Sequence, residues 1–294
     1  MNIVLKDVII LHPEQKLNEK TDILLEDGII KKIGSLSENE IKNSEVYNLE
    51  GNYVTPGFFD MHVHLREPGR EDKETVITGC NSAAAGGFTG IACMPNTDPT
   101  IDTAEVVTSI IIKSKNHLVD VHPIGAVSVG RKGESLAPIA ELVEAGAVGF
   151  SDDGVAVKSA SLLRNAIEYA GMYNAPIIEH CEDPSMDDGA MNESFTSTQL
   201  GLPGIPTAAE DLIVMRDILI AEYTGGRVHI AHISSKNSVD LVRQAKAKGI
   251  KVTAEVTPHH FLLNDESVKT FDTNYKMNPP LRSKEDVEAM IEGL

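Results

Sequence analysis

The sequence lacks the features that mark membrane-spanning, nucleic-acid-binding and disulfide-rich proteins. No apolar run approaches the roughly 20 residues that a membrane-spanning helix needs. Lys and Arg number 26 against 44 Asp and Glu, a formal net charge of −18 with no basic patch, so binding to duplex nucleic acid is disfavoured. The three cysteines form no Cys-x-x-Cys pair, and the N-terminus becomes charged too early for a signal peptide. We therefore expect a cytoplasmic protein with reduced thiols.

Two different patterns follow one another along the 294 residues. Residues 1–54 alternate between apolar and polar side chains, with turn residues at Asp27-Gly28, which predicts a small β domain with a hairpin. From residue 55 onward, short apolar runs alternate with helical stretches, as in parallel strands joined by helices. Strands are expected at 54–65, 90–94, 119–128, 147–151, 176–181, 228–234 and 250–257. Helices are expected at 103–115, 135–144, 159–173, 207–223 and 238–248, and from 283 onward.

Seven strands in about 200 residues favour a (β/α)8 TIM-type barrel over a doubly wound sheet. We expect this α/β barrel to occupy residues 55–294. An eighth strand would be due after Leu294, and a barrel without it has two open edges. We therefore expect the chain to be a truncated piece with an incomplete small β domain, unless another segment supplies the strand. Capping boxes are predicted where Thr207 precedes Glu210 and at the start of the last helix, at Ser283.

Candidate metal ligands lie at the C-terminal ends of the expected strands, where such barrels build their sites. His62 and His64 project from the same side of the first strand about 6.6 Å apart, so both imidazoles can reach one metal ion at roughly 2.0–2.1 Å. His180 ends the fifth strand and His232 ends the sixth. An isolated His-x-His pair is more often two polar residues on an exposed strand, but four histidines from three strands favour a metal site.

A carboxylate is expected beside these histidines. The fourth strand runs into Asp152 and Asp153, and only one of the two should face the metal because adjacent residues point to opposite faces. Alternation leaves open which one it is, and an ordinary Asp-Gly turn is the alternative. Glu179 and His229 have the opposite parity to the two later histidines and are expected to point away. Four histidines and one carboxylate suit two metal ions about 3.5–4 Å apart, which would activate water for attack on an amide or ester.

Further polar residues are candidates for binding substrate at the same rim. Arg66 follows the histidine pair and is suited to gripping a carboxylate, although a surface ion pair with a nearby glutamate explains it about as well. Asn96 and Asn278 follow later strands, although a turn and a proline-rich loop also explain them. The long stretch 184–206 is a candidate lid. Cys181 is expected to be a small buried thiol rather than a nucleophile.

Together these motifs resemble dihydroorotases, the zinc amidohydrolases of pyrimidine biosynthesis, and more narrowly their bacterial class I branch. The resemblance runs in order along the whole chain. The matching stretches are 57–69 with its His-Val-His-Leu-Arg, 94–97 (Met-Pro-Asn-Thr), 151–154 (Ser-Asp-Asp-Gly), 179–182 (Glu-His-Cys-Glu), 201–206 (Gly-Leu-Pro-Gly-Ile-Pro), 231–234 (Ala-His-Ile-Ser) and 277–282 (Met-Asn-Pro-Pro-Leu-Arg).

The resemblance implies reversible interconversion of L-dihydroorotate and N-carbamoyl-L-aspartate on the path to UMP, with two Zn²⁺ ions per active site. The zinc ligands that it implies are His62 and His64 for one ion, His180 and His232 for the other, and Asp153 between them. The residues that it assigns to substrate binding are His64, Arg66, Asn96 and Asn278. An aspartate in place of the carboxylated lysine of many relatives is what points to class I.

The family's general-base aspartate, on strand eight, has no counterpart before Leu294, so we expect it beyond that residue and expect residues 1–294 alone to be inactive or nearly so. Two other functions stay open. A hydantoinase- or allantoinase-like enzyme would share the histidines but should carry a bridging lysine. A non-catalytic scaffold for aspartate carbamoyltransferase would bind little metal. A homodimer and a complex with aspartate carbamoyltransferase are the open partner arrangements, and neither nucleic acid nor a membrane is expected.

Overall fold

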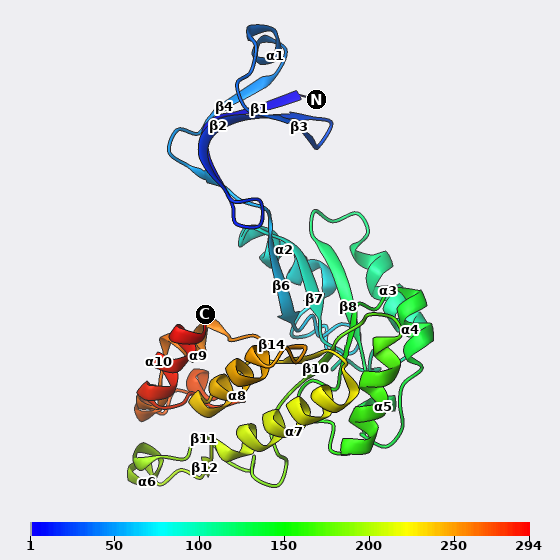
Figure 1. Cartoon of the computed structure of the whole chain (residues 1–294), viewed down its shortest axis with the longest axis vertical. Coiled ribbons are helices and arrows are strands. Elements are labelled where there is room, and N and C mark those ends of the chain that lie inside the picture. The colour runs from blue at the N-terminus through cyan, green and yellow to red at the C-terminus, as the bar shows by residue number, and fades with distance from the viewer. Residues whose placement is uncertain (1) are drawn as a thin grey trace. The chain divides into compact units, whose positions relative to one another are not determined.

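The computed structural model describes residues 2–294, and the chain divides into two compact units, Met1–Phe58 and Phe59–Leu294 (Figure 1). The sequence pattern placed this boundary between residues 54 and 55. Each unit has its own sheet and its own cluster of buried apolar side chains.

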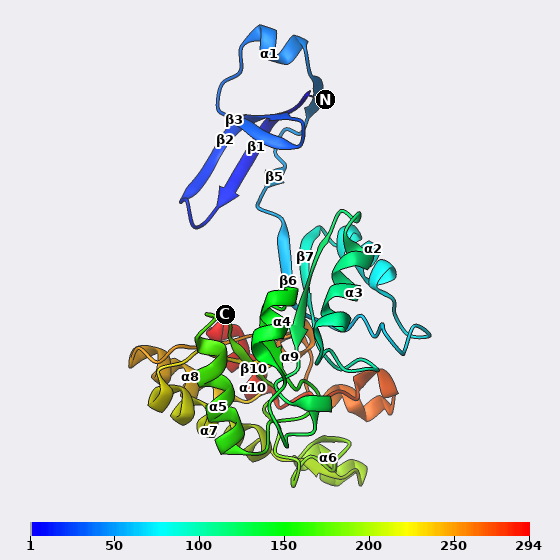
Figure 2. The ribbon, with the colours of Figure 1, turned by 90° about the vertical axis from the view of Figure 1, so that its right-hand side faces the viewer.

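The first unit is a small five-stranded sheet (Figure 2). Its elements are β1 (Asn2–His12), β2 (Leu17–Glu26), β3 (Ile29–Ile33), α1 (Glu38–Lys42), β4 (Glu45–Asn48) and β5 (Tyr53–Val54). β2 and β3 pair in antiparallel fashion, and the turn residues Asp27 and Gly28 have φ of 50° and 81°, as a tight hairpin of this kind requires. The predicted hairpin is thus confirmed. β4 and β5 pair with β1 in parallel, which the alternating pattern did not predict.

The second unit contains a seven-stranded parallel sheet in the order β14-β13-β10-β9-β8-β7-β6. The strands are β6 (Phe58–Val63), β7 (Phe88–Cys93), β8 (Asp120–Gly125), β9 (Gly149–Ser151), β10 (Ile177–Glu179), β13 (Val228–Ile230) and β14 (Val252–Ala254). Each strand neighbours the next one in the barrel series, as right-handed crossovers produce. The predicted barrel fold with seven strands is confirmed. In the part of the chain that the structure describes, β6 and β14 are therefore the two edges of this sheet.

Helices pack against one face of these strands, and the unit's largest apolar cluster lies between the two layers. The helices are α2 (Val76–Ala85), α3 (Ala104–Ser114), α4 (Ile139–Ala145), α5 (Ala160–Gly171), α7 (Ala208–Thr224), α8 (Lys236–Ala247), α9 (Pro258–Leu262) and α10 (Lys284–Gly293). A smaller buried cluster of Ala92, Met94, Ile124, Ile178 and Ala231 is separate from the large one. Ile178 belongs to the small cluster and Ile177 to the large one, because adjacent strand residues point to opposite faces.

One predicted capping box is confirmed and the other is wrong. At the start of α10, the Ser283 side chain accepts from the backbone N–H of Asp286, and the Asp286 side chain accepts from the backbone N–H of Ser283. Thr207 makes no side-chain cap at the start of α7. Glu210 instead accepts hydrogen bonds from the backbone N–H groups that follow β13, at Ser234 and Ser235. The Glu210 side chain thus bonds to the loop after β13 and does not form the capping box with Thr207.

The stretch predicted as a lid carries structure of its own. It contains β11 (Met191–Asn192), α6 (Phe195–Leu200) and β12 (Gly204–Ile205), with β11 and β12 paired. Ser194 Oγ donates to the carboxylate of Asp265, in the 3-10 turn η2 (Asp265–Thr270), at 2.7 Å. The fully buried Arg282 donates to the carbonyl oxygen of Ile205 at 2.8 Å. The stretch is thus held to the segment that follows β14. Two further 3-10 turns are η1 (Val129–Arg131) and η3 (Thr273–Tyr275).

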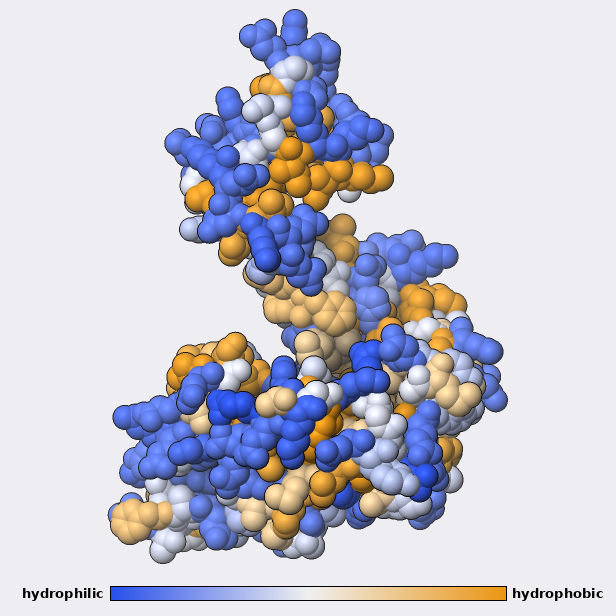
Figure 3. All heavy atoms as spheres, viewed as in Figure 1, coloured by the Kyte–Doolittle hydropathy of each residue, from blue (hydrophilic) through white to orange (hydrophobic). Residues whose placement is uncertain are grey.

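The visible surface is mainly hydrophilic, with hydrophobic side chains in separate patches (Figure 3). Among residues 2–294, no helix has the length and apolar content needed to cross a membrane. The three cysteines are buried and unpaired. Burial raises the pKa of the Cys181 thiol well above its usual value, with Asp217 and Glu179 adding to the effect, so the prediction of an inert buried thiol is confirmed.

Candidate metal centre

The two histidines of the first barrel strand meet a carboxylate from the fourth. His62 is the last residue but one of β6 and His64 directly follows the strand, so both side chains lie on one face. His62 Nε2 lies 3.3 Å from Asp153 Oδ1, and His64 Nε2 lies 3.6 Å from Asp153 Oδ2. The two carboxylate oxygens therefore each face one imidazole of the pair.

The later strands bring two more histidines to the same carboxylate. His180 directly follows β10, and its Nδ1 lies 3.8 Å from Asp153 Oδ1. His232 Nε2 lies 3.6 Å from the same oxygen and 3.0 Å from His180 Nδ1. His232 comes two residues after the end of β13 and has φ of 33°, so the chain has left the regular strand before this side chain turns toward the site.

The two adjacent aspartates after β9 have separate surroundings. Asp152 accepts hydrogen bonds from the backbone N–H groups of Val127 and Ser128, both at 3.0 Å, and from the Ser128 hydroxyl. Asp153 faces the histidines, and its backbone N–H donates to Ser151 Oγ at 3.0 Å. Adjacent residues thus point apart, as strand alternation predicted, and the structure supplies the choice between them that alternation left open.

The residues present fit a pair of metal ions. His62, His64 and Asp153 form one group of possible ligands, and Asp153, His180 and His232 form a second, with the ligand atoms of each group within 4.8 Å of one another. Asp153 Oδ1 is buried and has no hydrogen-bond partner, although three imidazole nitrogens surround it. A buried carboxylate oxygen without a partner is costly unless a cation meets it. Imidazole and carboxylate are ligands that zinc accepts.

The charges of the group are arranged around Asp153. Burial opposes ionisation of this carboxyl, but the neighbouring imidazoles of His180, His232 and His62 outweigh it and hold the pKa well below its usual value. Burial likewise opposes protonation of His62 and His180, yet their carboxylate partners raise the pKa of His62 to about 10 and that of His180 to about 9. Burial lowers the pKa of His64 to about 4 and also lowers the pKa of His232. A metal ion would take the place of the protons that balance the carboxylate.

Three of the four histidines have a second polar partner, bound to the ring nitrogen that does not face Asp153. Glu255 Oε1 lies 2.5 Å from His62 Nδ1, Asn96 Oδ1 lies 2.9 Å from His64 Nδ1, and Glu182 Oε2 lies 3.2 Å from His180 Nε2. Such partners fix the tautomer and the orientation of metal-binding histidines. Sequence reasoning missed both glutamates. Glu255 follows the seventh strand and Glu182 lies two residues after His180, so a search for carboxylates at every strand end would have found them.

The residues expected to bind substrate have different positions. Asn96 lies within the histidine group, since its amide also donates to Asp153 Oδ2 at 3.3 Å. Arg66 has φ of 61°, and no hydrogen bond or ion pair of its side chain occurs among residues 2–294, so the surface ion pair weighed for it is absent there. Asn278 is exposed and precedes a cis peptide bond to Pro279. Within the described chain, no hydrogen bond joins Asn278 to the histidine group.

Glu179 and His229 were both expected to point away from the site, and they lie in different surroundings. Glu179 lies on the helix side of β10, where its carboxylate accepts from the Val157 backbone N–H at 3.3 Å and from Arg216 of α7 at 3.4 Å. His229 does not leave the site region, because its Nε2 lies 3.3 Å from the same Glu255 carboxylate that meets His62. The parity argument was wrong for His229, since it treated His232 as part of a regular strand.

Comparisons with solved structures place the fold. An L-hydantoinase (dihydropyrimidinase) from Arthrobacter aurescens superposes with a TM-score of 0.83 at 22% identity, and the match covers 98% of this chain and 65% of that one. A D-hydantoinase superposes with a TM-score of 0.78 at 21% identity and covers 99% and 66%. These likenesses show that the chain has the barrel fold of the hydantoinase structures.

Sequence comparisons identify the family. A family model described as Dihydro-orotase-like matches residues 51–238. A dihydroorotase from Acetivibrio thermocellus is 53% identical over 287 residues, covering 97% of this chain and 67% of the relative. One from Pelotomaculum thermopropionicum is 50% identical over 295 residues, covering 100% and 69%. The chain belongs to the dihydroorotase family. It spans about two thirds of the length of the curated relatives and of the solved structures that it matches.

Proposed function

We propose that the whole protein that contains this chain is a zinc-dependent dihydroorotase, which interconverts L-dihydroorotate and N-carbamoyl-L-aspartate reversibly in pyrimidine biosynthesis. Membership of the family supports the reaction. The observation that carries the chemistry is the buried Asp153 carboxylate with two histidines on either side, because this arrangement suits two ions sharing one ligand. A cytoplasmic location, which the unpaired cysteines favour, is part of the proposal, and the homodimer and the aspartate carbamoyltransferase complex stay untested predictions.

In the proposed function, the role of this chain's own residues is to hold the metal ions and to orient the substrate. His62, His64, His180 and His232 bind through the nitrogens that face Asp153, and the Asp153 carboxylate holds the two groups together. Two zinc ions bound there supply activated water at neutral pH and polarise the amide carbonyl of the substrate. His64, Arg66, Asn96 and Asn278 bind substrate in this proposal.

Among residues 2–294 the guanidinium of Arg66 makes no hydrogen bond or ion pair, which leaves it available for the carboxylate of dihydroorotate. The proposed activity is that of the whole protein, because this chain spans about two thirds of the length of its curated relatives.

A comparison of substrates tests the proposal. The purified whole protein should contain zinc and hydrolyse dihydroorotate with a larger kcat/KM than hydantoin or allantoin. The hydantoinase alternative rests on the fold likeness, and a preference for hydantoin would favour it over our proposal. Near-zero zinc together with no turnover of any of these cyclic amides would favour the non-catalytic scaffold.

A further inference from the structure

Glu255 makes a contact that the proposed reaction does not account for. It is the first residue after β14, and its Oε1 lies 2.5 Å from His62 Nδ1. The opposite nitrogen of the same ring, Nε2, lies 3.3 Å from Asp153 Oδ1. Both side chains of this pair are 12% exposed. The imidazole of His62 is thus held between two carboxylates, one on each ring nitrogen.

This contact joins the two edges of the seven-stranded sheet. His62 belongs to β6 and Glu255 follows β14, and in residues 2–294 each of these strands has a sheet neighbour on one side only. The two residues are 193 positions apart in the chain. The bond therefore joins side chains that lie close in space although no backbone pairing links β6 to β14 within residues 2–294.

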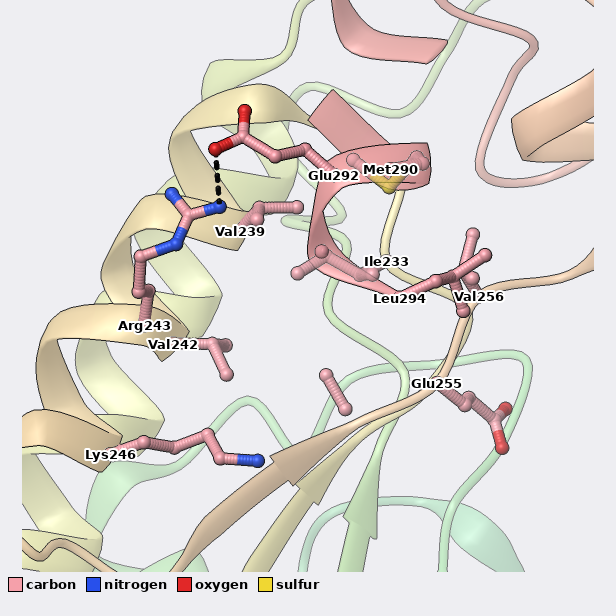
Figure 4. A pocket seen from close by; sticks show the side chains of 12 residues that line it. Ile233, Val239, Val242, Arg243, Lys246, Glu255, Val256, Met290, Glu292 and Leu294 are labelled. Carbon is pink, nitrogen blue, oxygen red and sulfur yellow. Dashed lines mark ion pairs between the residues drawn. The ribbon is translucent and has the colours of Figure 1, made fainter. Parts of the chain in front are cut away.

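The glutamate is itself fixed by the strands beside it. Its Oε2 lies 3.3 Å from His229 Nε2, and His229 Nδ1 lies 2.8 Å from the hydroxyl of Thr253 on β14. The backbone N–H of His232 donates to Glu255 Oε1 at 3.3 Å. Partners from β13 and β14 thus hold the carboxylate in one orientation. Glu255 also lines the pocket of Val242 and Met290, but in Figure 4 its carboxylate points away from Val242.

We propose that Glu255 is a positioning residue that accepts the Nδ1 proton of His62 and so presents Nε2 to the metal subsite formed with His64 and Asp153. The inference rests on the metal centre of the proposed function but not on the identity of the substrate. Carboxylate–histidine–metal arrangements of this kind typically contribute 10–100-fold to metal affinity. Glu182 stands in the same relation to His180 and offers a matched comparison for the other subsite.

Zinc affinity of the two subsites, measured on the whole protein by competition with a chromophoric chelator, tests the inference without any assay of turnover. Glu255→Gln keeps the shape of the side chain and removes its charge, and we expect one of the two zinc affinities to fall about 10–100-fold while the other stays within about threefold. Glu182→Gln should weaken the other subsite instead. Asp286→Asn, which weakens the side-chain cap at the start of α10 and touches none of the four histidines, should lower the thermal midpoint and leave both zinc affinities unchanged.

A double-mutant cycle separates positioning from general support of the fold. If Glu255 acts through His62, adding Glu255→Gln to His62→Asn changes neither zinc affinity further, so the two effects are non-additive. Additive effects, equal losses at both subsites, or wild-type affinities in Glu255→Gln would overturn the inference. A protein that binds two zinc ions as expected but does not hydrolyse dihydroorotate would refute the proposed function and leave this inference standing.

Discussion

The two halves of the proposed metal centre share one carboxylate but have different partners. His180 and His232 follow strands with sheet neighbours on both sides, and their side chains are 7% and 11% exposed. His62 lies in β6, which is an edge of the sheet within residues 2–294, and His64 follows it; their side chains are 12% and 29% exposed. We call this pair the edge half and the other pair the interior half. The polar partners of the edge half, Glu255 and Asn96, come from distant segments, whereas His180 of the interior half has the nearby Glu182.

The two halves differ in how far along the chain their partners lie. Glu182 is two residues from His180, whereas Glu255 is 193 residues from His62 and Asn96 is 32 residues from His64. The orientation of His62 and His64 therefore depends on the tertiary fold, whereas His180 also has a local partner. Changes at the shared carboxylate should therefore affect both halves, and changes at the distant partners should affect only the edge half.

The largest effect is expected for Asp153→Asn, because this carboxylate belongs to both halves. The variant should lose zinc from both subsites, and its kcat/KM for dihydroorotate should fall by more than the roughly 100-fold that losing an outer partner costs. Metal analysis and steady-state kinetics of the whole protein check it. If the variant kept zinc in one half at wild-type affinity, the two halves would not share Asp153.

The edge and interior halves also differ in how far the sequence predicts them. Strand alternation predicts that His62 and His64 lie together, because β6 is regular up to them. It fails at His232, whose φ of 33° takes the chain out of the strand, and so it also misplaces His229. A positive φ in a residue other than glycine leaves no signal in the residue pattern.

Long-range contacts are the other part that the sequence does not predict. The helix start at Ser283 follows from four neighbouring residues and is confirmed, whereas the predicted cap at Thr207 is wrong because Glu210 bonds to the loop after β13 instead. Glu255 was missed for the same reason. Its partner His62 lies at the other edge of the sheet, and only the closing of the barrel brings the two together.

A smaller effect, confined to the edge half, is expected for Asn96→Ala. Its amide meets His64 Nδ1 at 2.9 Å and Asp153 Oδ2 at 3.3 Å, so the truncation should lower zinc affinity at the edge subsite about 10–100-fold. Chelator competition on the whole protein measures it, with Glu182→Gln as the comparison for the interior half. A raised KM for dihydroorotate with both zinc affinities intact would mean that Asn96 serves substrate alone.

The smallest effect concerns a histidine that meets no carboxylate. His260 is buried, with its Nδ1 2.7 Å from the Thr257 hydroxyl and its Nε2 donating to the Pro279 carbonyl oxygen at 2.9 Å. Burial lowers its pKa to about 3, and nearby positive groups add to the effect. The neutral ring is thus favoured in the folded state, in contrast to His62 and His180, whose carboxylate partners favour the charged ring.

Because the folded-state pKa of His260 lies below the unfolded value of about 6.5, its contribution to stability is full above pH 6.5 and is lost as the pH falls toward 3. The loss should reach about 2 kcal/mol at pH 5. His260→Gln cannot titrate, so its free energy of unfolding, measured by urea denaturation, should fall less between pH 7 and pH 5 than that of the wild type. Above pH 7 the two proteins should show the same pH dependence, since the ring is neutral in both states there. Parallel curves across the acid range would instead mean that His260 takes up its proton in the folded protein, and the contrast between this histidine and those around Asp153 would then disappear.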